Sequence, residues 1–165
     1  VLLMHLIQQR IQQNKGLLFI DLKGDRETIL KLSQFAAQAN RLEDLEIFSM
    51  SDQKLSHPYN LLNGGSPTQL RDRIMCSLNW SEEYYKNQAS SFLLKLMIVF
   101  CFLRDSKNLR FHIGDVLEAT NSTAKIIELT KLIPENESKL RAHAQSVKDF
   151  LDSKEHFNSL QGLRT

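Results

Sequence analysis

Few cysteines and scattered histidines leave the 165-residue sequence without a recognisable metal or redox motif. Its two cysteines, Cys76 and Cys101, share no CxxC spacing, and both lie in apolar helical patterns. This placement predicts two small buried side chains in a reducing compartment. The five histidines form no HExxH pair, so we expect no metal site.

A long apolar run is also lacking. The most apolar segment, residues 92–103, spans 12 residues and contains Lys95. A bilayer crossing needs roughly 20 residues, so we expect a buried core helix and no direct membrane contact by this chain. The sequence begins without methionine and without a signal-peptide pattern, which predicts that it starts inside a larger protein.

Neither sign of charge dominates the chain. There are 21 Lys and Arg against 19 Asp and Glu, which gives a formal net charge of +2. Such a small excess does not by itself indicate a nucleic-acid-binding protein. The composition, 42% hydrophobic and 24% charged, is that of an ordinary globular protein.

Helical patterns alternate with short apolar runs in the first 65 residues. Residues 1–13 and 26–38 have apolar side chains at helical spacing. Residues 17–20 form a short continuous apolar run, which predicts a strand buried in a parallel sheet, and residues 45–50 predict a second strand. We therefore expect an α/β fragment, a partial parallel sheet completed by strands from outside this sequence.

Residues 66–165 predict only helices, so the chain is expected to be predominantly helical. Ser66 and Pro67 supply an N-cap and a first helical residue, and Ser81 precedes a second, long helix. Pro134 is expected to start the last one. The predicted helices cover residues 66–78, 82–104, 113–119, 122–132 and 135–160. This pattern predicts a partial nucleotide-binding domain at 1–65 and an all-α domain at 66–165.

A polar cluster follows the first predicted strand. Asp21, Lys23, Gly24 and Asp25 would lie at the edge where open α/β sheets bind ligands. There Asp21 would face a metal or a nucleotide-bound water, and Lys23 a phosphate. The alternative is a strand-to-helix turn in which Gly24 gives backbone freedom and Asp25 caps the next helix.

A phosphate-binding loop is lacking. No GxxxxGK[ST] segment occurs. In addition, Leu22 follows Asp21 at the position where an ATPase with such an aspartate at the end of a strand usually has glutamate. We therefore expect no catalytic residues and no ATP hydrolysis by this chain.

Aromatic and basic residues in the second half suggest a contact surface for nucleic acid or a protein partner. The segment 79–85 holds three aromatic residues beside cations, a combination that can stack on single-stranded bases. The alternative is a helix start whose aromatic rings pack under the bundle. The candidate contact residues are Arg71, Arg73, Lys86, Lys107 and Arg110.

Two segments together resemble one protein family. The DLKGD turn at residues 21–25 and the SHPYNLL connector at residues 56–62 occur in the order found in the TraG/TraD-like coupling-protein ATPases of conjugation and type IV secretion. Leu61 departs from the pattern, since the family usually has proline there. The resemblance implies a RecA-like motor domain into which residues 66–165 are inserted as an all-α domain.

The same resemblance implies the function. The parent would be a homohexameric motor at the inner membrane that uses ATP and Mg²⁺, whereas the fragment itself needs no cofactor. Residues 66–165 would lie at the cytoplasmic face and recruit the relaxase or relaxosome, effector proteins or single-stranded DNA. Two alternatives stay open: a nucleotide-handling core of a DNA-translocating NTPase, and a structural helical domain for subunit contacts.

Overall fold

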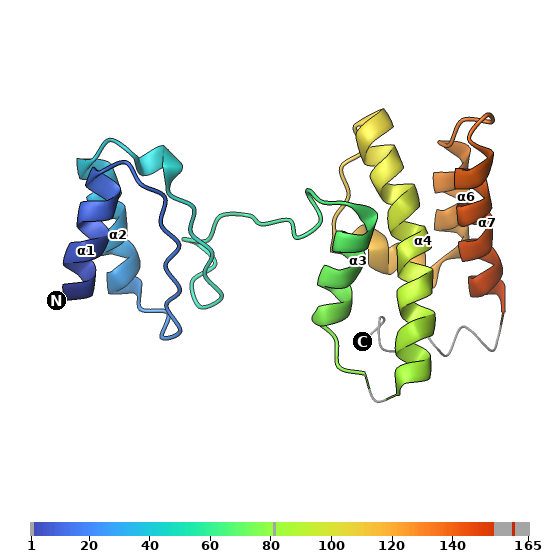
Figure 1. The fold of residues 1–165 in the computed structure, drawn as a ribbon, viewed down its shortest axis with the longest axis horizontal. Coiled ribbons are helices and arrows are strands. Elements are labelled where there is room, and N and C mark those ends of the chain that lie inside the picture. Colours follow the sequence, from blue (N-terminus) through green and yellow to red (C-terminus); the bar gives the residue numbers. More distant parts are fainter. Residues whose placement is uncertain (1, 81, 154–159, 161–165) are drawn as a thin grey trace. The chain divides into compact units, whose positions relative to one another are not determined.

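Two compact units make up the chain in this computed structural model, which describes residues 2–80, 82–153 and 160 (Figure 1). The N-terminal unit, Val1–Tyr59, contains α1 (Leu2–Gln12), α2 (Arg26–Gln38) and the short 3₁₀ helix η1 (Leu42–Asp44). The helical unit, Asn60–Thr165, contains α3 (Pro67–Cys76), α4 (Glu83–Lys107), α5 (Ile113–Asn121), α6 (Thr123–Lys131) and α7 (Ser138–Asp152). The boundary between the two units lies between Tyr59 and Asn60, whereas the domain boundary expected from the sequence follows residue 65.

The α/β fold expected from the sequence is wrong, because the described residues contain helices and no strand. The segments predicted as strands, residues 17–20 and 45–50, form no regular secondary structure. Their apolar side chains are largely exposed, with Leu18 at 84% and Phe48 at 70%. A strand requires a neighbouring backbone for its hydrogen bonds. In the described chain residues 17–20 and 45–50 do not form the repeated backbone hydrogen bonds of a strand pair, so no sheet forms.

The N-terminal unit is held together by the packing of α1 against α2. Ile7 and Ala36 are its buried apolar side chains, each 3% exposed. Asn14 has a left-handed φ of 55° just after α1, where the helical pattern of residues 1–13 ends. The Arg41 guanidinium donates to the Ile11 carbonyl at 3.2 Å and the Lys15 carbonyl at 3.3 Å. A cation on carbonyls at and just beyond the end of α1 stabilises the C-terminal end of the helix.

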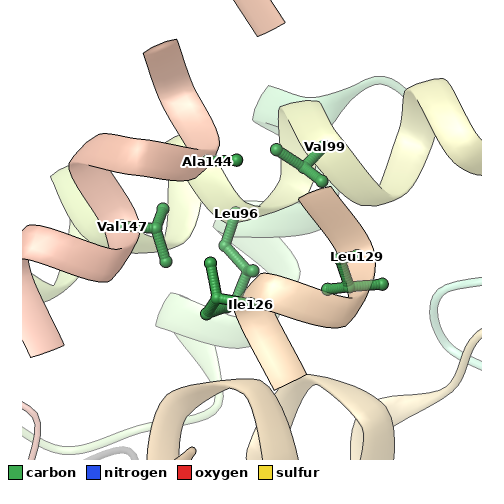
Figure 2. Close-up of a pocket in the computed structure, with 6 residues that line it drawn as sticks. All are labelled: Leu96, Val99, Ile126, Leu129, Ala144 and Val147. Atoms are coloured by element: carbon green, nitrogen blue, oxygen red, sulfur yellow. The ribbon is translucent and has the colours of Figure 1, made fainter. Parts of the chain in front are cut away.

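The core of the helical unit is organised around α4, which Figure 1 shows between α3 and α7. In addition, α6 packs on α7 and α5 packs on α6. Figure 2 shows side chains from α4, α6 and α7 meeting in the interior. The space between them is too small for a water molecule. These side chains are Leu96, Val99, Ile126, Leu129, Ala144 and Val147. The buried core helix expected over residues 92–103 is therefore confirmed.

Lys95 interrupts the apolar run of α4, and its half-buried side chain has a hydrogen-bond partner. Its ammonium donates a hydrogen bond of 2.7 Å to the Ser146 hydroxyl on α7. The long aliphatic stem of a lysine can lie along apolar surface while its charged end reaches a polar group.

Helix boundaries follow the predicted signals in part. Ser66 caps α3, because its hydroxyl accepts from the Gln69 amide at 3.3 Å while the Gln69 side chain accepts from the Ser66 amide at 2.9 Å. By contrast, α7 begins at Ser138, since a turn closed by the Glu137 amide on the Pro134 carbonyl precedes it. Ser81 and the predicted end of the last helix over 154–159 lie outside the described residues.

The two cysteines differ in their surroundings. Cys101 is buried in α4, and burial raises the pKa of its thiol. Cys76 is exposed, so the prediction of two buried thiols is wrong for this residue. The buried side chains of α3 are Leu70, Ile74 and Met75, and Cys76, the last residue of the helix, does not share their burial.

Candidate functional site

The first predicted site, residues 21–25, is a turn organised by the carboxylate of Asp21. One oxygen of Asp21 accepts from the Lys23 amide at 3.0 Å, and the other accepts from the Asp25 amide at 3.1 Å. These two backbone hydrogen bonds favour the ionised carboxylate and lower the pKa of Asp21. The turn thus binds the Asp21 carboxylate, the group that the sequence predicted to face a metal or a nucleotide-bound water.

Gly24 and Asp25 complete the turn as the alternative interpretation predicted. Gly24 has a φ of +66°, the left-handed region in which side chains are strained. Asp25 is the N-cap of α2, where its carboxylate accepts from the Glu27 amide at 3.0 Å. The Ser51 hydroxyl donates to the Gly24 carbonyl at 3.4 Å, so the end of the 45–50 segment lies beside this turn.

The described contacts of these residues are those of the turn itself. Both Asp21 oxygens are already hydrogen-bonded to the turn, and Lys23 is exposed to solvent. In the described part of the chain, no group of three or more His, Cys, Asp or Glu side chains is placed to hold a metal ion. The geometry therefore supports a turn that leads from residues 17–20 into α2.

The SHPYNLL connector joins the two units, and its first half is tied to the N-terminal unit. The His57 amide donates to the Ile47 carbonyl at 2.7 Å, and the Ile47 amide donates to the His57 ring nitrogen Nδ1 at 2.9 Å. Asn60 belongs to the helical unit, where its side-chain amide donates to the Phe111 carbonyl at 2.7 Å. The connector thus makes contacts on both sides of the unit boundary.

The structure separates the predicted contact residues of the helical unit into different places. Lys86 lies in the first turn of α4, next to the exposed pair Tyr84 and Tyr85, whose rings are 5.5 Å apart. Lys107 is the last residue of α4, and Arg110 follows it. At about 1.5 Å per residue, Lys86 and Lys107 are about 31 Å apart along the helix. They cannot contact the same small group.

Arg71 and Arg73, on α3, make contacts within the unit. Arg71 pairs with the carboxylate of its neighbour Asp72 at 2.6 Å. The Arg73 guanidinium donates to the Leu61 carbonyl at 2.9 Å and to the Gly64 carbonyl at 2.6 Å. Arg73 therefore holds the loop that precedes α3, a role that the sequence did not indicate.

A recess of about 360 Å³ opens beside that loop at the end of α4. Its walls come from the loop before α3, from the last turn of α4 and from the segment that leads to α5. The lining residues are Leu62, Asn63, Arg104, Asn108, Arg110 and Phe111. Of these, only Arg110 was predicted as a contact residue, so the structure brings new side chains to it.

Arg104 is the main residue of the recess that sequence reasoning missed. It donates from Nε to Asp105 at 2.7 Å, and from Nη2 to Asp105 at 3.2 Å and to the Gly65 carbonyl at 3.1 Å. The Asp105 carboxylate raises the pKa of Arg104, and Arg104 lowers that of Asp105. The remaining nitrogen, Nη1, is buried without a hydrogen-bond partner in the described structure.

No protein-family model, curated protein or solved structure matches the chain. Among the helices that the structure describes, none combines the length and the apolar character needed to cross a bilayer.

Proposed function

We propose that the helical unit recruits cargo for a coupling protein of conjugative DNA transfer or type IV secretion. The cargo would be a relaxase with its relaxosome or an effector protein, with single-stranded DNA reaching the same surface. The parent would be a hexameric ATP- and Mg²⁺-dependent motor, and this unit would lie at the cytoplasmic face of the inner membrane.

The observation that carries this proposal is the basic end of a separately packed helical unit. Lys107 and Arg110 are both exposed there, and no described acidic side chain forms an ion pair with either. Exposed unpaired cations attract acidic proteins and nucleic acid and increase the rate of encounter. The cargo class comes from the resemblance of the DLKGD and SHPYNLL segments to the coupling-protein family.

The proposal places recruitment in Asn60–Thr165 and makes no use of a motor fold in the N-terminal unit. The described residues of Val1–Tyr59 contain no sheet, and the 21–25 turn satisfies its own carboxylate. The nucleotide-handling alternative therefore gains no support from the geometry.

Site-specific photo-crosslinking in cells that make the whole protein tests the recruiting role. A photoreactive amino acid would replace Lys107 at the basic end of the helical unit. A second chain would carry it in place of Lys15, an exposed residue of the N-terminal unit, as the matched control. We expect a relaxase, a relaxosome protein or a secreted effector to crosslink from position 107 and not from position 15.

Two results would count against recruitment. Crosslinks from position 107 to copies of this same chain would favour the subunit-contact alternative. Crosslinks to neither relaxosome proteins nor effectors, in cells shown to be transferring DNA or effectors, would remove the proposal.

A further inference from the structure

We propose that the recess at the end of α4 is a binding site for a phosphate group. Its volume, about 360 Å³, lies within the roughly 300–1,000 Å³ of small-molecule pockets. The recess would bind phosphate whether or not the helical unit recruits cargo.

The balance of charge at the recess favours an anion. Arg104, Lys107 and Arg110 bring three positive charges to a span of seven residues, and Asp105 is the one carboxylate among them. The C-terminal end of α4 adds a partial negative charge equivalent to about half an elementary charge. The net charge of this span, three positive less one negative, still exceeds that partial charge. An anionic group would therefore be attracted to this end of the helix.

The lining side chains are rich in hydrogen-bond donors. Arg110 is exposed and has no described partner, and the Arg104 guanidinium also lines the recess. Asn63 and Asn108 carry side-chain amides with two N–H donors each. Phosphate oxygens only accept hydrogen bonds, and the planar guanidinium fork matches them in a bidentate manner. A phosphate can use more of these donors than a single carboxylate, because it presents more oxygens and more charge.

The walls of the recess are fixed before any ligand arrives. Asn60 ties the loop to the opposite wall through its bond to the Phe111 carbonyl, and it also accepts from the Leu62 amide at 2.9 Å. The Phe111 ring stacks on Phe100 of the core, with ring centres 4.6 Å apart. Arg104 is held by Asp105 and by the Gly65 carbonyl. Such preorganisation lowers the entropy lost when a ligand binds.

Titration of the whole protein with inorganic phosphate tests the site, with amide and arginine Nε–H signals followed by NMR at low ionic strength. We expect saturable shifts at Asn63, Arg104 and Arg110. Arg110→Gln should weaken phosphate binding about tenfold, since it removes a charge-assisted hydrogen bond. The isosteric Asn63→Asp should abolish binding, because it places a carboxylate in the recess. Arg10→Gln is the matched control: it removes the same charge from an exposed arginine of the N-terminal unit.

The result that overturns the site is a lack of saturable shifts at the recess, or equal weakening by Arg110→Gln and Arg10→Gln. Acetate binding as tightly as phosphate would also overturn it, since the recess would then be a carboxylate site.

A short single-stranded oligonucleotide and adenosine monophosphate identify the source of the phosphate. Tighter binding of the oligonucleotide, lost in Arg110→Gln, assigns a nucleic-acid backbone. Tighter binding of the mononucleotide, lost in the same variant, assigns a free phosphate compound. Either of these two results supports the phosphate site.

Discussion

Two side chains of the predicted sites, a carboxylate and a guanidinium group, form hydrogen bonds with nearby backbone groups of the chain. These hydrogen bonds give both side chains a structural role. Asp21 accepts the amides of Lys23 and Asp25, and Arg73 donates to two carbonyls of the loop before α3. Both residues have the chemistry of a ligand site, but both stabilise local structure. A residue type in a suitable position is therefore weak support for a binding role unless its hydrogen-bonding capacity is free.

Acidification should release the 21–25 turn at a pH below the usual carboxyl range. The pKa of Asp21 is lowered in the folded chain, so its two hydrogen bonds are fully present above the usual value of 3.8 and are lost as pH falls through the lower folded value. In an NMR pH titration, the amide protons of Lys23 and Asp25 should shift with a midpoint below 3.8. Asp21→Asn should remove this transition. A midpoint at or above 3.8 would show that the bonds do not form in solution.

Removing the Arg73 side chain should destabilise the helical unit. Arg73→Ala deletes two hydrogen bonds to the loop, and the exposure of this side chain limits the loss to about 1 kcal/mol. Urea unfolding followed by the fluorescence of Trp80, which packs against the core of this unit, measures the change. Lys139→Ala, at an exposed site on α7, should change stability by less than about 0.5 kcal/mol. Equal stability of the two variants would contradict the loop-holding role.

Helices were predicted well because each carries its own evidence in the periodicity of its apolar residues. The α2 helix was predicted over residues 26–38 and is observed at Arg26–Gln38, and the cap at Ser66 was also foreseen. The segments 17–20 and 45–50 were predicted wrongly, because a short apolar run shows a tendency to be buried and does not reveal whether a partner strand exists. In the described chain Leu18 and Phe48 are instead exposed.

The recess could not be predicted for a related reason. Arg104 and Gly65 are 39 residues apart, and only the packing of α3 against α4 brings them together. The sequence showed cations at Lys107 and Arg110, but it gave no signal that Asn63 from the preceding loop would line the same hollow. Local patterns locate helices and caps, whereas sites built from distant segments require the fold.

Neighbouring isoleucines on α6 provide a matched test of the core. Ile126 lies among side chains of α4 and α7 (Figure 2) and is 2% exposed, whereas Ile127 is 43% exposed. Ile126→Ala should cost about 2–5 kcal/mol, because it removes buried methyl groups and leaves a cavity in a space that is now closed to water. Ile127→Ala should cost less than about 1 kcal/mol. Urea unfolding monitored by Trp80 separates them, and similar losses would show that α6 packs in another orientation.

The whole molecule consists of two units with different surfaces and different amounts of core. The N-terminal unit buries few apolar side chains and leaves Leu18, Leu22 and Met50 exposed. The helical unit contains the continuous hydrophobic core and the basic recess. If cargo recruitment is the role of this chain, we expect the surface for it on Asn60–Thr165 and not on Val1–Tyr59.

Hydrogen–deuterium exchange of the whole chain, with and without the cargo identified by crosslinking, tests the central claim most directly. We expect slower exchange on binding in the segments around residues 61–65 and 104–111 of the helical unit, with the N-terminal unit unchanged. Protection confined to residues 2–59, with the end of α4 unaffected, would contradict the assignment of recruitment to the helical unit.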